Sequence, residues 1–161
     1  MAQLKRGRER LLEWPARLDA LMGDSLELRQ WTAMGPALLE AKKEKPPWLT
    51  VDLLKDHQGV IQERTQTMDQ ELKAGLESGA KVPAAGEAAD QGAGLVATLK
   101  EAQPLVAGVV VAFSQSMDAL NGADLARAAA HQGEAIAGLA KTRELFLDIK
   151  GLLDLAWQDE N

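Results

Sequence analysis

The stretch Pro104–Phe113, PLVAGVVVAF, is the most apolar run in the chain, and the fold can be worked out from it. Valine favours strands, so the ten residues alone could form a buried strand or a buried helix. The spacing of the surrounding residues decides for a helix, because it alternates steps of four and three. The residues that keep this spacing are Leu95, Leu99, Ala102, Val106, Val109, Phe113, Ser116 and Leu120.

This pattern predicts a central helix over residues 91–119. Leu105 and Val110 widen its apolar face, which indicates contact with more than one neighbouring helix. Pro104 lacks a backbone donor, so we expect the helix either to kink near this residue or to start afresh there. The apolar run is far shorter than the ~20 residues that span a bilayer, which favours a helix in a protein core.

Two more long helices are predicted, over residues 51–79 and 124–157. Thr50 and Asp124 are their expected N-caps, since the side-chain oxygens can accept from free amides of the first turn. The first stripe is Leu54, His57, Ile61, Thr65, Met68, Leu72 and Leu76. The second is Leu125, Ala129, Gln132, Ile136, Leu139, Phe146, Ile149, Leu153 and Trp157. Small residues between Ala128 and Gly138 predict a close helix approach in that region.

The first 48 residues predict shorter helices. Pro15 invites a break, and Gly23 offers a stop with Asp24–Ser25 supplying the next cap. Gly35–Pro36 interrupts the second helix. The segment 41–48, AKKEKPPW, then ends the helical region, because its prolines cannot continue a helix.

No stretch predicts a strand. The expected fold class is therefore all-α, an antiparallel bundle of about four to five helices within a single domain, residues 1–161. The three long helices form its body, and the short helices of residues 1–48 supply the fourth wall. Residues 80–90 are rich in glycine and alanine and predict a loose linker.

Composition and charge restrict the classes of function. The chain has no cysteine, which excludes disulfides, thiolate zinc sites and cysteine nucleophiles. Its net charge is −6, divided into +2 over the first 45 residues and −8 over the rest, which argues against a broad nucleic-acid interface. The N-terminus has a basic start but no apolar segment behind it, so a cytoplasmic location is expected.

The N-terminal arm is locally basic, since the four basic residues among its first ten outnumber Glu9. Its basic side chains could contact an anionic membrane surface or a phosphate backbone, but we favour a solvated face packed beside the protein's own acidic helices. These basic residues and two tryptophans are the candidate partner-binding residues: Lys5, Arg6, Arg8, Arg10, Trp14 and Trp157.

The two histidines, His57 and His131, both stand in the tripeptide His-Gln-Gly, which suggests a weak internal duplication. Carboxylate-bridged metal bundles place a glutamate three residues before the histidine, whereas this chain has Leu54 and Ala128 there. We therefore expect no metal and no cofactor. Gln132 lies on the apolar stripe and could fix helix register as a buried amide beside Arg143, although an edge position is favoured.

No phosphate-binding glycine loop, nucleophile elbow or zinc-protease helix is present, so an enzyme is not expected. The leading hypothesis is a non-catalytic helical-bundle module that acts through protein–protein interaction, as an adaptor, a structural protein or a self-associating homo-oligomer. The alternative is a small-molecule-sensing or carrier bundle with a cavity between the central and last helices. That cavity would be left by Gly108, Ala112, Gly133 and Gly138.

Overall fold

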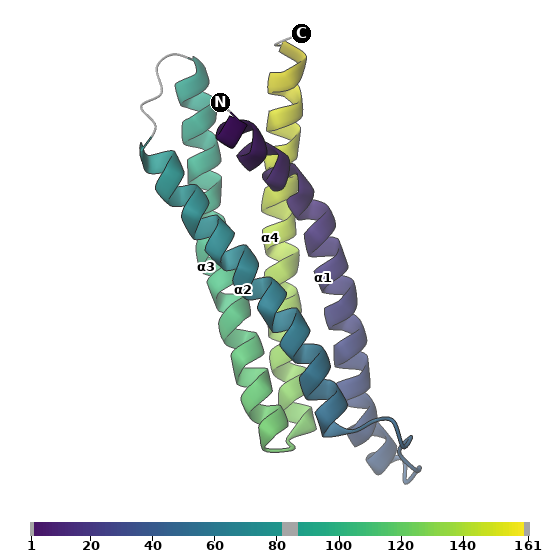
Figure 1. Cartoon of the computed structure of the whole chain (residues 1–161). Coiled ribbons are helices and arrows are strands. Elements are labelled where there is room, and N and C mark those ends of the chain that lie inside the picture. The colour runs from purple at the N-terminus through teal and green to yellow at the C-terminus, as the bar shows by residue number, and fades with distance from the viewer. Residues whose placement is uncertain (1, 82–86, 160–161) are drawn as a thin grey trace.

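The structure, a computed structural model, is an antiparallel bundle of four helices (Figure 1). It describes residues 2–81 and 87–159, with the side chains of residues 13–77 and 96–148. The helices are α1 (Ala2–Glu40), α2 (Val51–Lys81), α3 (Glu87–Asn121) and α4 (Leu125–Asp159). The described backbone contains no strand, so the predicted all-α class and bundle architecture are confirmed.

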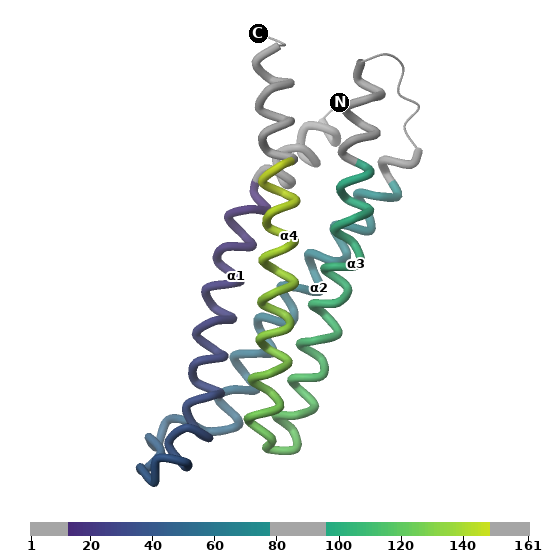
Figure 2. The backbone as a smooth tube through the Cα atoms, turned by 180° about the vertical axis from the view of Figure 1, so that it is seen from behind, coloured from purple at the N-terminus to yellow at the C-terminus, as the bar shows by residue number. Residues whose placement is uncertain are grey.

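Each helix packs against two neighbours. α1 lies between α2 and α4, and α3 lies between the same two helices on the other side. Figure 2, seen from behind, shows α4 between α1 and α3. α2 and α4 are therefore diagonally opposite across the core. The contact between α3 and α4 is the most extensive of the four, and the contact between α1 and α2 is the least extensive.

The core follows one spacing rule in all four helices, which bury side chains alternately four and three residues apart. The seam predicted for the central helix is confirmed from Leu99 to Leu120. The seams are Trp14, Leu18, Leu21, Ser25, Leu28 and Thr32 in α1; Leu54, Gln58, Ile61, Thr65, Met68 and Leu72 in α2; Leu99, Ala102, Val106, Val109, Phe113, Ser116 and Leu120 in α3; and Ala128, Gln132, Ala135, Leu139, Thr142 and Phe146 in α4.

α1 is one continuous helix of 39 residues, so the prediction of shorter helices in this region is wrong. It runs without a break through Pro15, Gly23 and Gly35–Pro36. Ser25, expected to help cap a second helix, is instead buried in the seam, where its hydroxyl donates to the Leu21 carbonyl at 2.6 Å. The cost of an interior glycine is about 1 kcal/mol and of an interior proline about 3 kcal/mol. Burial of a whole apolar seam outweighs such local costs.

The other helices differ less from their predicted bounds. α2 and α3 extend to Lys81 and from Glu87, so both enter the predicted linker, and residues 82–86 lie outside the described part of the chain. α3 continues through Pro104, so it does not start afresh there. Pro104 is exposed, and a carbonyl left without its donor on that face can bond to water.

Both predicted N-caps are confirmed. The Leu53 amide donates to Thr50 Oγ1 at 3.1 Å, and the Arg127 amide donates to Asp124 Oδ1 at 3.2 Å. These bonds satisfy first-turn donors that have no partner within the helix. The start of α2 and the start of α4 are therefore set by local sequence.

α1 and α3 end in the same backbone motif. Lys42 (φ 55°) and Ala123 (φ 56°) both adopt the left-handed conformation that L-residues rarely take. In each motif this residue's amide donates three residues back, and the next amide donates five residues back. The bonds are Lys42 N to Leu39 O (3.1 Å), Lys43 N to Leu38 O (2.9 Å), Ala123 N to Leu120 O (3.0 Å) and Asp124 N to Ala119 O (2.9 Å).

One part of α3, Val96–Asn121, is long and apolar enough to cross a membrane by length and composition. The shortness of the ten-residue apolar run is therefore no argument against a membrane span. In this structure the same residues carry the buried α3 seam, which packs between α2 and α4.

Candidate interaction surface

The contact between α1 and α2 is lined by three pairs of side chains at heptad spacing. Arg17 Nη1 lies 2.7 Å from Glu71 Oε2, and Arg64 Nη1 lies 2.5 Å from Asp24 Oδ2. Seven residues further along both helices, the rings of Trp31 and His57 lie 4.8 Å apart. We call these three pairs the α1–α2 ladder.

The ladder fixes the register of the two helices. Sliding α2 by one heptad would place Arg17 opposite Arg64 in one direction, or Asp24 opposite Glu71 in the other. Like charges would then face each other and disfavour the shifted register. Charged pairs select the partner and orientation of coiled-coil helices in the same way. The ion pairs are partly solvated, with side chains 26% to 49% exposed, so they select the register more than they add stability.

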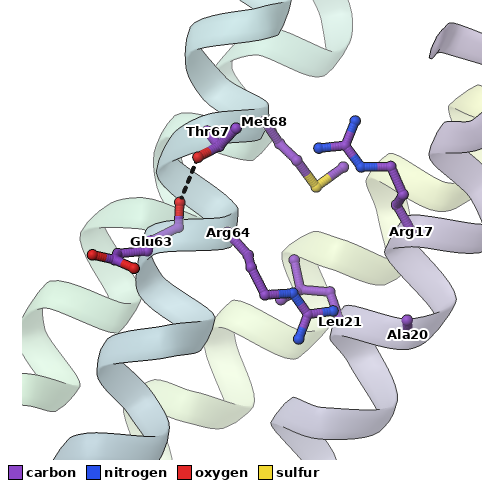
Figure 3. Close-up of a pocket in the computed structure, with 7 residues that line it drawn as sticks. All are labelled: Arg17, Ala20, Leu21, Glu63, Arg64, Thr67 and Met68. Carbon is purple, nitrogen blue, oxygen red and sulfur yellow. Dashed lines mark hydrogen bonds between the residues drawn. The ribbon is translucent and has the colours of Figure 1, made fainter.

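A cavity of about 310 Å³ opens between the two ion pairs of the ladder (Figure 3). Leu21 of α1 and Met68 of α2 are its buried apolar residues. Arg17 reaches in from α1 and Arg64 from α2, each toward the facing helix. The remaining lining residues are Ala20, Glu63 and Thr67. The cavity thus combines an apolar patch with two guanidinium groups.

The other end of the ladder is aromatic. Trp48, from the loop between α1 and α2, makes an edge contact with Trp31 at 5.7 Å between ring centroids. Leu49 is 1% exposed and anchors the loop to the core, while Trp48 remains 49% exposed. The loop thus holds half of a large aromatic side chain in solvent.

α1 extends past the rest of the bundle at this end. A Cβ on Gly35 would lie 2.9 Å from Leu125 Cδ1, so the first residue of α4 is level with Gly35. α1 continues to Glu40, and Figure 1 shows its end and the following loop beyond the turn between α3 and α4. Leu39 comes seven residues after the buried Thr32, yet it is 81% exposed because no helix faces it.

We call residues 36–50 the overhang. Three of its side chains are exposed lysines, Lys42, Lys43 and Lys45. With Glu40 and Glu44, the overhang carries three positive and two negative charges, a net charge of +1, on a protein whose net charge is −6. The overhang therefore presents Leu39 and Trp48 beside a locally basic segment.

Three buried polar side chains meet inside the bundle. Gln58 Oε1 accepts from Ser116 Oγ at 2.7 Å and from Gln132 Nε2 at 2.9 Å. Gln58 Nε2 donates to the Phe113 carbonyl at 2.8 Å, and Ser116 Oγ also lies 3.1 Å from the Ala128 carbonyl. The three side chains are 0% exposed. This core network joins α2, α3 and α4.

The core network explains the repeated His-Gln-Gly tripeptide, because the glutamines of the two copies bond to each other. Gln132 is fully buried, so the favoured expectation of an edge position is wrong and the register interpretation is supported. His57, placed on the buried stripe by sequence, is only half-buried, and Gln58 occupies the seam instead. Arg143, expected beside Gln132, pairs with Asp19 of α1 on the surface.

Gln132 Oε1 is buried without a hydrogen-bond partner among the described residues. α1 and α4 pack with Trp14 against Phe146 and Gly35 against Leu125, which puts Leu28 of α1 level with Gln132. α3 offers the hydroxyl of Ser116 to Gln58, whereas the α1 residue level with Gln132 is the aliphatic Leu28. The side-chain oxygen and nitrogen atoms of Gln58 and Ser116 therefore all have hydrogen-bond partners, whereas Gln132 Oε1 has no described partner.

The candidate partner-binding residues are not brought together by the described part of the structure. Trp14 is 1% exposed and stacks on Phe146 with ring centroids 4.5 Å apart, so its ring belongs to the core. The side chains of the remaining candidates, Lys5, Arg6, Arg8, Arg10 and Trp157, lie outside the described residues. Sequence reasoning missed Leu39, although its seven-residue spacing from Thr32 was a usable signal.

The described histidines do not gather metal ligands. Among the residues with described side chains, no group of three or more His, Asp or Glu could hold an ion. His131 Nδ1 lies 3.3 Å from Glu134 Oε2, and His57 packs on Trp31. Both histidines are therefore partly exposed and contact a neighbouring side chain, Glu134 for His131 and Trp31 for His57.

The small residues of α3 and α4 bring these helices together, as predicted. A Cβ on Gly138 would lie 2.6 Å from Val109 Cγ2 and 3.7 Å from the Leu105 carbonyl oxygen. Gly133 likewise makes room for a side chain of α1, since a Cβ there would lie 3.2 Å from Arg29 Nε. At these two positions the space is filled by neighbouring side chains, which argues against a cavity there.

No protein-family model, no curated protein and no solved structure matches the chain.

Proposed function

We propose that this protein is a non-catalytic helical-bundle module that binds another protein through the overhang. The observation that carries the proposal is the exposure of Leu39 (81%) and Trp48 (49%) at one end of the bundle. Leu39 continues the seam spacing of α1 beyond the last helix that could cover it. An apolar seam residue without a partner in its own chain is a natural contact for a second chain.

The charge of the overhang indicates the chemistry of the partner. Lys42, Lys43 and Lys45 are exposed in the segment that joins Leu39 to Trp48, so an acidic peptide segment with an aliphatic or aromatic anchor would match this end of the bundle. The anchor would bury against Leu39 and Trp48, and the lysines would raise the association rate and make it salt-dependent. Residues 46–161 carry nine basic and seventeen acidic side chains, a net charge of −8, and would repel such a peptide, which favours the overhang over the surfaces of α2, α3 and α4.

A selection from a displayed random peptide library tests the proposal. We expect enriched peptides to combine Asp or Glu with one large apolar residue, and to change the fluorescence of the half-exposed Trp48. Leu39→Ser and Trp48→Ser should each weaken the binding by about tenfold or more. Val111→Ser is the matched control, since Val111 is 54% exposed on the outer face of α3, outside the overhang.

Two outcomes would count against the overhang. One is the failure of the library to yield any peptide whose binding depends on Leu39 or Trp48. The other is an equal loss of binding in the Val111→Ser control, which would move the contact to another face. Circular dichroism of each variant separates lost contact from lost fold.

The cavity in the α1–α2 ladder supports a second candidate, a small-molecule-binding bundle. Its volume of about 310 Å³ is at the lower end of the range for ligand pockets. Leu21 and Met68 would contact an apolar chain, while a ligand carboxylate would compete with Glu71 for Arg17 or with Asp24 for Arg64. Octanoate is a suitable probe, and stabilisation that rises with its concentration and is lost in Met68→Gln would support this candidate. An unchanged melting temperature up to millimolar octanoate would remove it.

A further inference from the structure

α1 is held in the bundle differently from the other three helices. Among the described side chains, every hydrogen bond or ion pair from α1 to another helix involves a partly exposed group. These contacts are Arg17 with Glu71, Asp24 with Arg64, Asp19 with Arg143, and Arg29 Nε with the Ala129 carbonyl at 3.2 Å. The core network joins α2, α3 and α4 without any atom of α1.

The buried hydroxyl groups of α1 are satisfied within α1 itself. Ser25 Oγ donates to the Leu21 carbonyl at 2.6 Å, and Thr32 Oγ1 donates to the Leu28 carbonyl at 2.8 Å. Neither bond is lost when the helix leaves its groove. α1 can therefore separate from α2, α3 and α4 as an intact helix, without leaving one of its own buried polar groups unpaired.

The groove that α1 occupies is matched to its sequence. Trp14 stacks on Phe146, and Gly35 makes room for Leu125, whose Cδ1 would lie 2.9 Å from an added Cβ. Gly133 of α4 in turn makes room for Arg29. A helix of different sequence would lose the ring stack or clash at Gly35. The helix that fits this groove best, apart from the chain's own, is α1 of a second copy.

The connection between α1 and α2 can act as a hinge. It spans residues 41–50, of which 41–48 precede the buried Leu49 and can reach about 26 Å when extended. Its second residue, Lys42, has φ 55°, a conformation that is unfavourable for a side chain with a Cβ. Opening the connection at Lys42 would relieve this strain. The turn between α3 and α4 carries the same strain at Ala123, but the core network ties those two helices together.

We propose that two copies of the chain exchange α1, each inserting it into the α2–α3–α4 groove of the other, to form a dimer with Lys42 as the hinge. The ladder and the Trp14–Phe146 stack form between chains in the dimer as they form within one chain in the monomer. A linker of this length gives an effective concentration on the order of millimolar, so the dimer forms in concentrated protein. The inference does not rest on the proposed function, because it needs no partner other than this chain.

The experiment mixes equal amounts of isotope-labelled and unlabelled protein at about 1 mM, warms the mixture to just below its melting temperature and cools it. Size-exclusion chromatography with light scattering should then show a species of twice 17.3 kDa that persists on dilution. Isotope-filtered nuclear Overhauser spectra of this species should connect the Trp14 ring of one chain with the Phe146 ring of the other. A protein that stays monomeric throughout, or a dimer without this cross-chain contact, would overturn the proposal.

Two matched glycine variants test the hinge. Lys42→Gly removes the strain from the closed monomer and should lower the dimer fraction by about tenfold. Ala123→Gly removes the same strain from the turn between α3 and α4, which is closed in both states, and should leave the dimer fraction unchanged. An equal response of the two variants, or a response of Ala123→Gly alone, would contradict a hinge at Lys42.

Discussion

α1 and the unit formed by α2, α3 and α4 use the same seam spacing but different chemistry. The part of α1 with described side chains contributes six seam residues, and the two polar ones bond back to their own helix. In the other three helices, Gln58, Ser116 and Gln132 bond across the core. Polar side chains that bond within their own helix do not restrict how far that helix can shift along its neighbours. Bonds across the core do restrict it, because each requires a partner at a fixed position on another helix. Register in this bundle therefore depends on the core network for three helices, and on the surface ladder and the fit of Trp14 and Gly35 against α4 for the fourth.

The comparison predicts a large effect at the centre of the core network. Gln58→Ala would leave Ser116 Oγ and Gln132 Nε2 without their shared acceptor and would create a cavity. We expect a loss of about 3–5 kcal/mol in the free energy of unfolding. Urea denaturation, followed by circular dichroism, measures this change.

The control lies in the same helix, two seam positions further on. Thr65 Oγ1 donates only to the Ile61 carbonyl of its own helix, at 2.9 Å. Thr65→Val should therefore change the unfolding free energy by less than about 1 kcal/mol. Similar losses in Gln58→Ala and Thr65→Val would mean that the network carries no special weight.

A smaller effect is expected for Gln132→Met. Gln132 already has a buried oxygen without a described partner, and its removal leaves Ser116 still donating to Gln58 Oε1. The lost bond and the relieved oxygen offset each other, so the unfolding free energy should change by about 1 kcal/mol or less. A loss as large as that of Gln58→Ala would show that Gln132 Oε1 has a partner, such as an internal water molecule.

The smallest effect concerns the ladder. Arg17→Glu places a carboxylate opposite Glu71 and should destabilise the fold by about 0.5–1 kcal/mol at low salt. Adding Glu71→Arg should restore the pair with reversed charges, and ~1 M salt should remove most of the difference. A double variant no more stable than Arg17→Glu alone would rule out pairing between these positions.

The local sequence was sufficient to predict much of the fold. The seam of α3 and the caps Thr50 and Asp124 were predicted, because spacing and capping act over one or two helical turns. The continuity of α1 was not predicted. Pro15 and Gly23 are breakers in isolation, and only the packing of the full seam against α2 and α4 overrides them.

The candidate surface was harder to predict than the fold. Leu39 has the spacing of a buried residue, and its exposure depends on where α4 begins relative to α1. The bond between Gln58 and Gln132 joins residues 74 positions apart and requires the relative heights of α2 and α4. Both features follow from inter-helix register, which a single sequence does not specify. The repeated tripeptide hinted at the second feature but did not say which of its residues meet.

Native-state hydrogen exchange tests the central claim most directly. If α1 is attached by apolar contacts and surface pairs alone, its amides between residues 16 and 34 should exchange through an opening that spares α2, α3 and α4. We expect their exchange to be at least tenfold faster than that of the seam amides around Gln58, Ser116 and Gln132. Equal protection of α1 and these seam amides, lost together in a single global unfolding, would contradict the account.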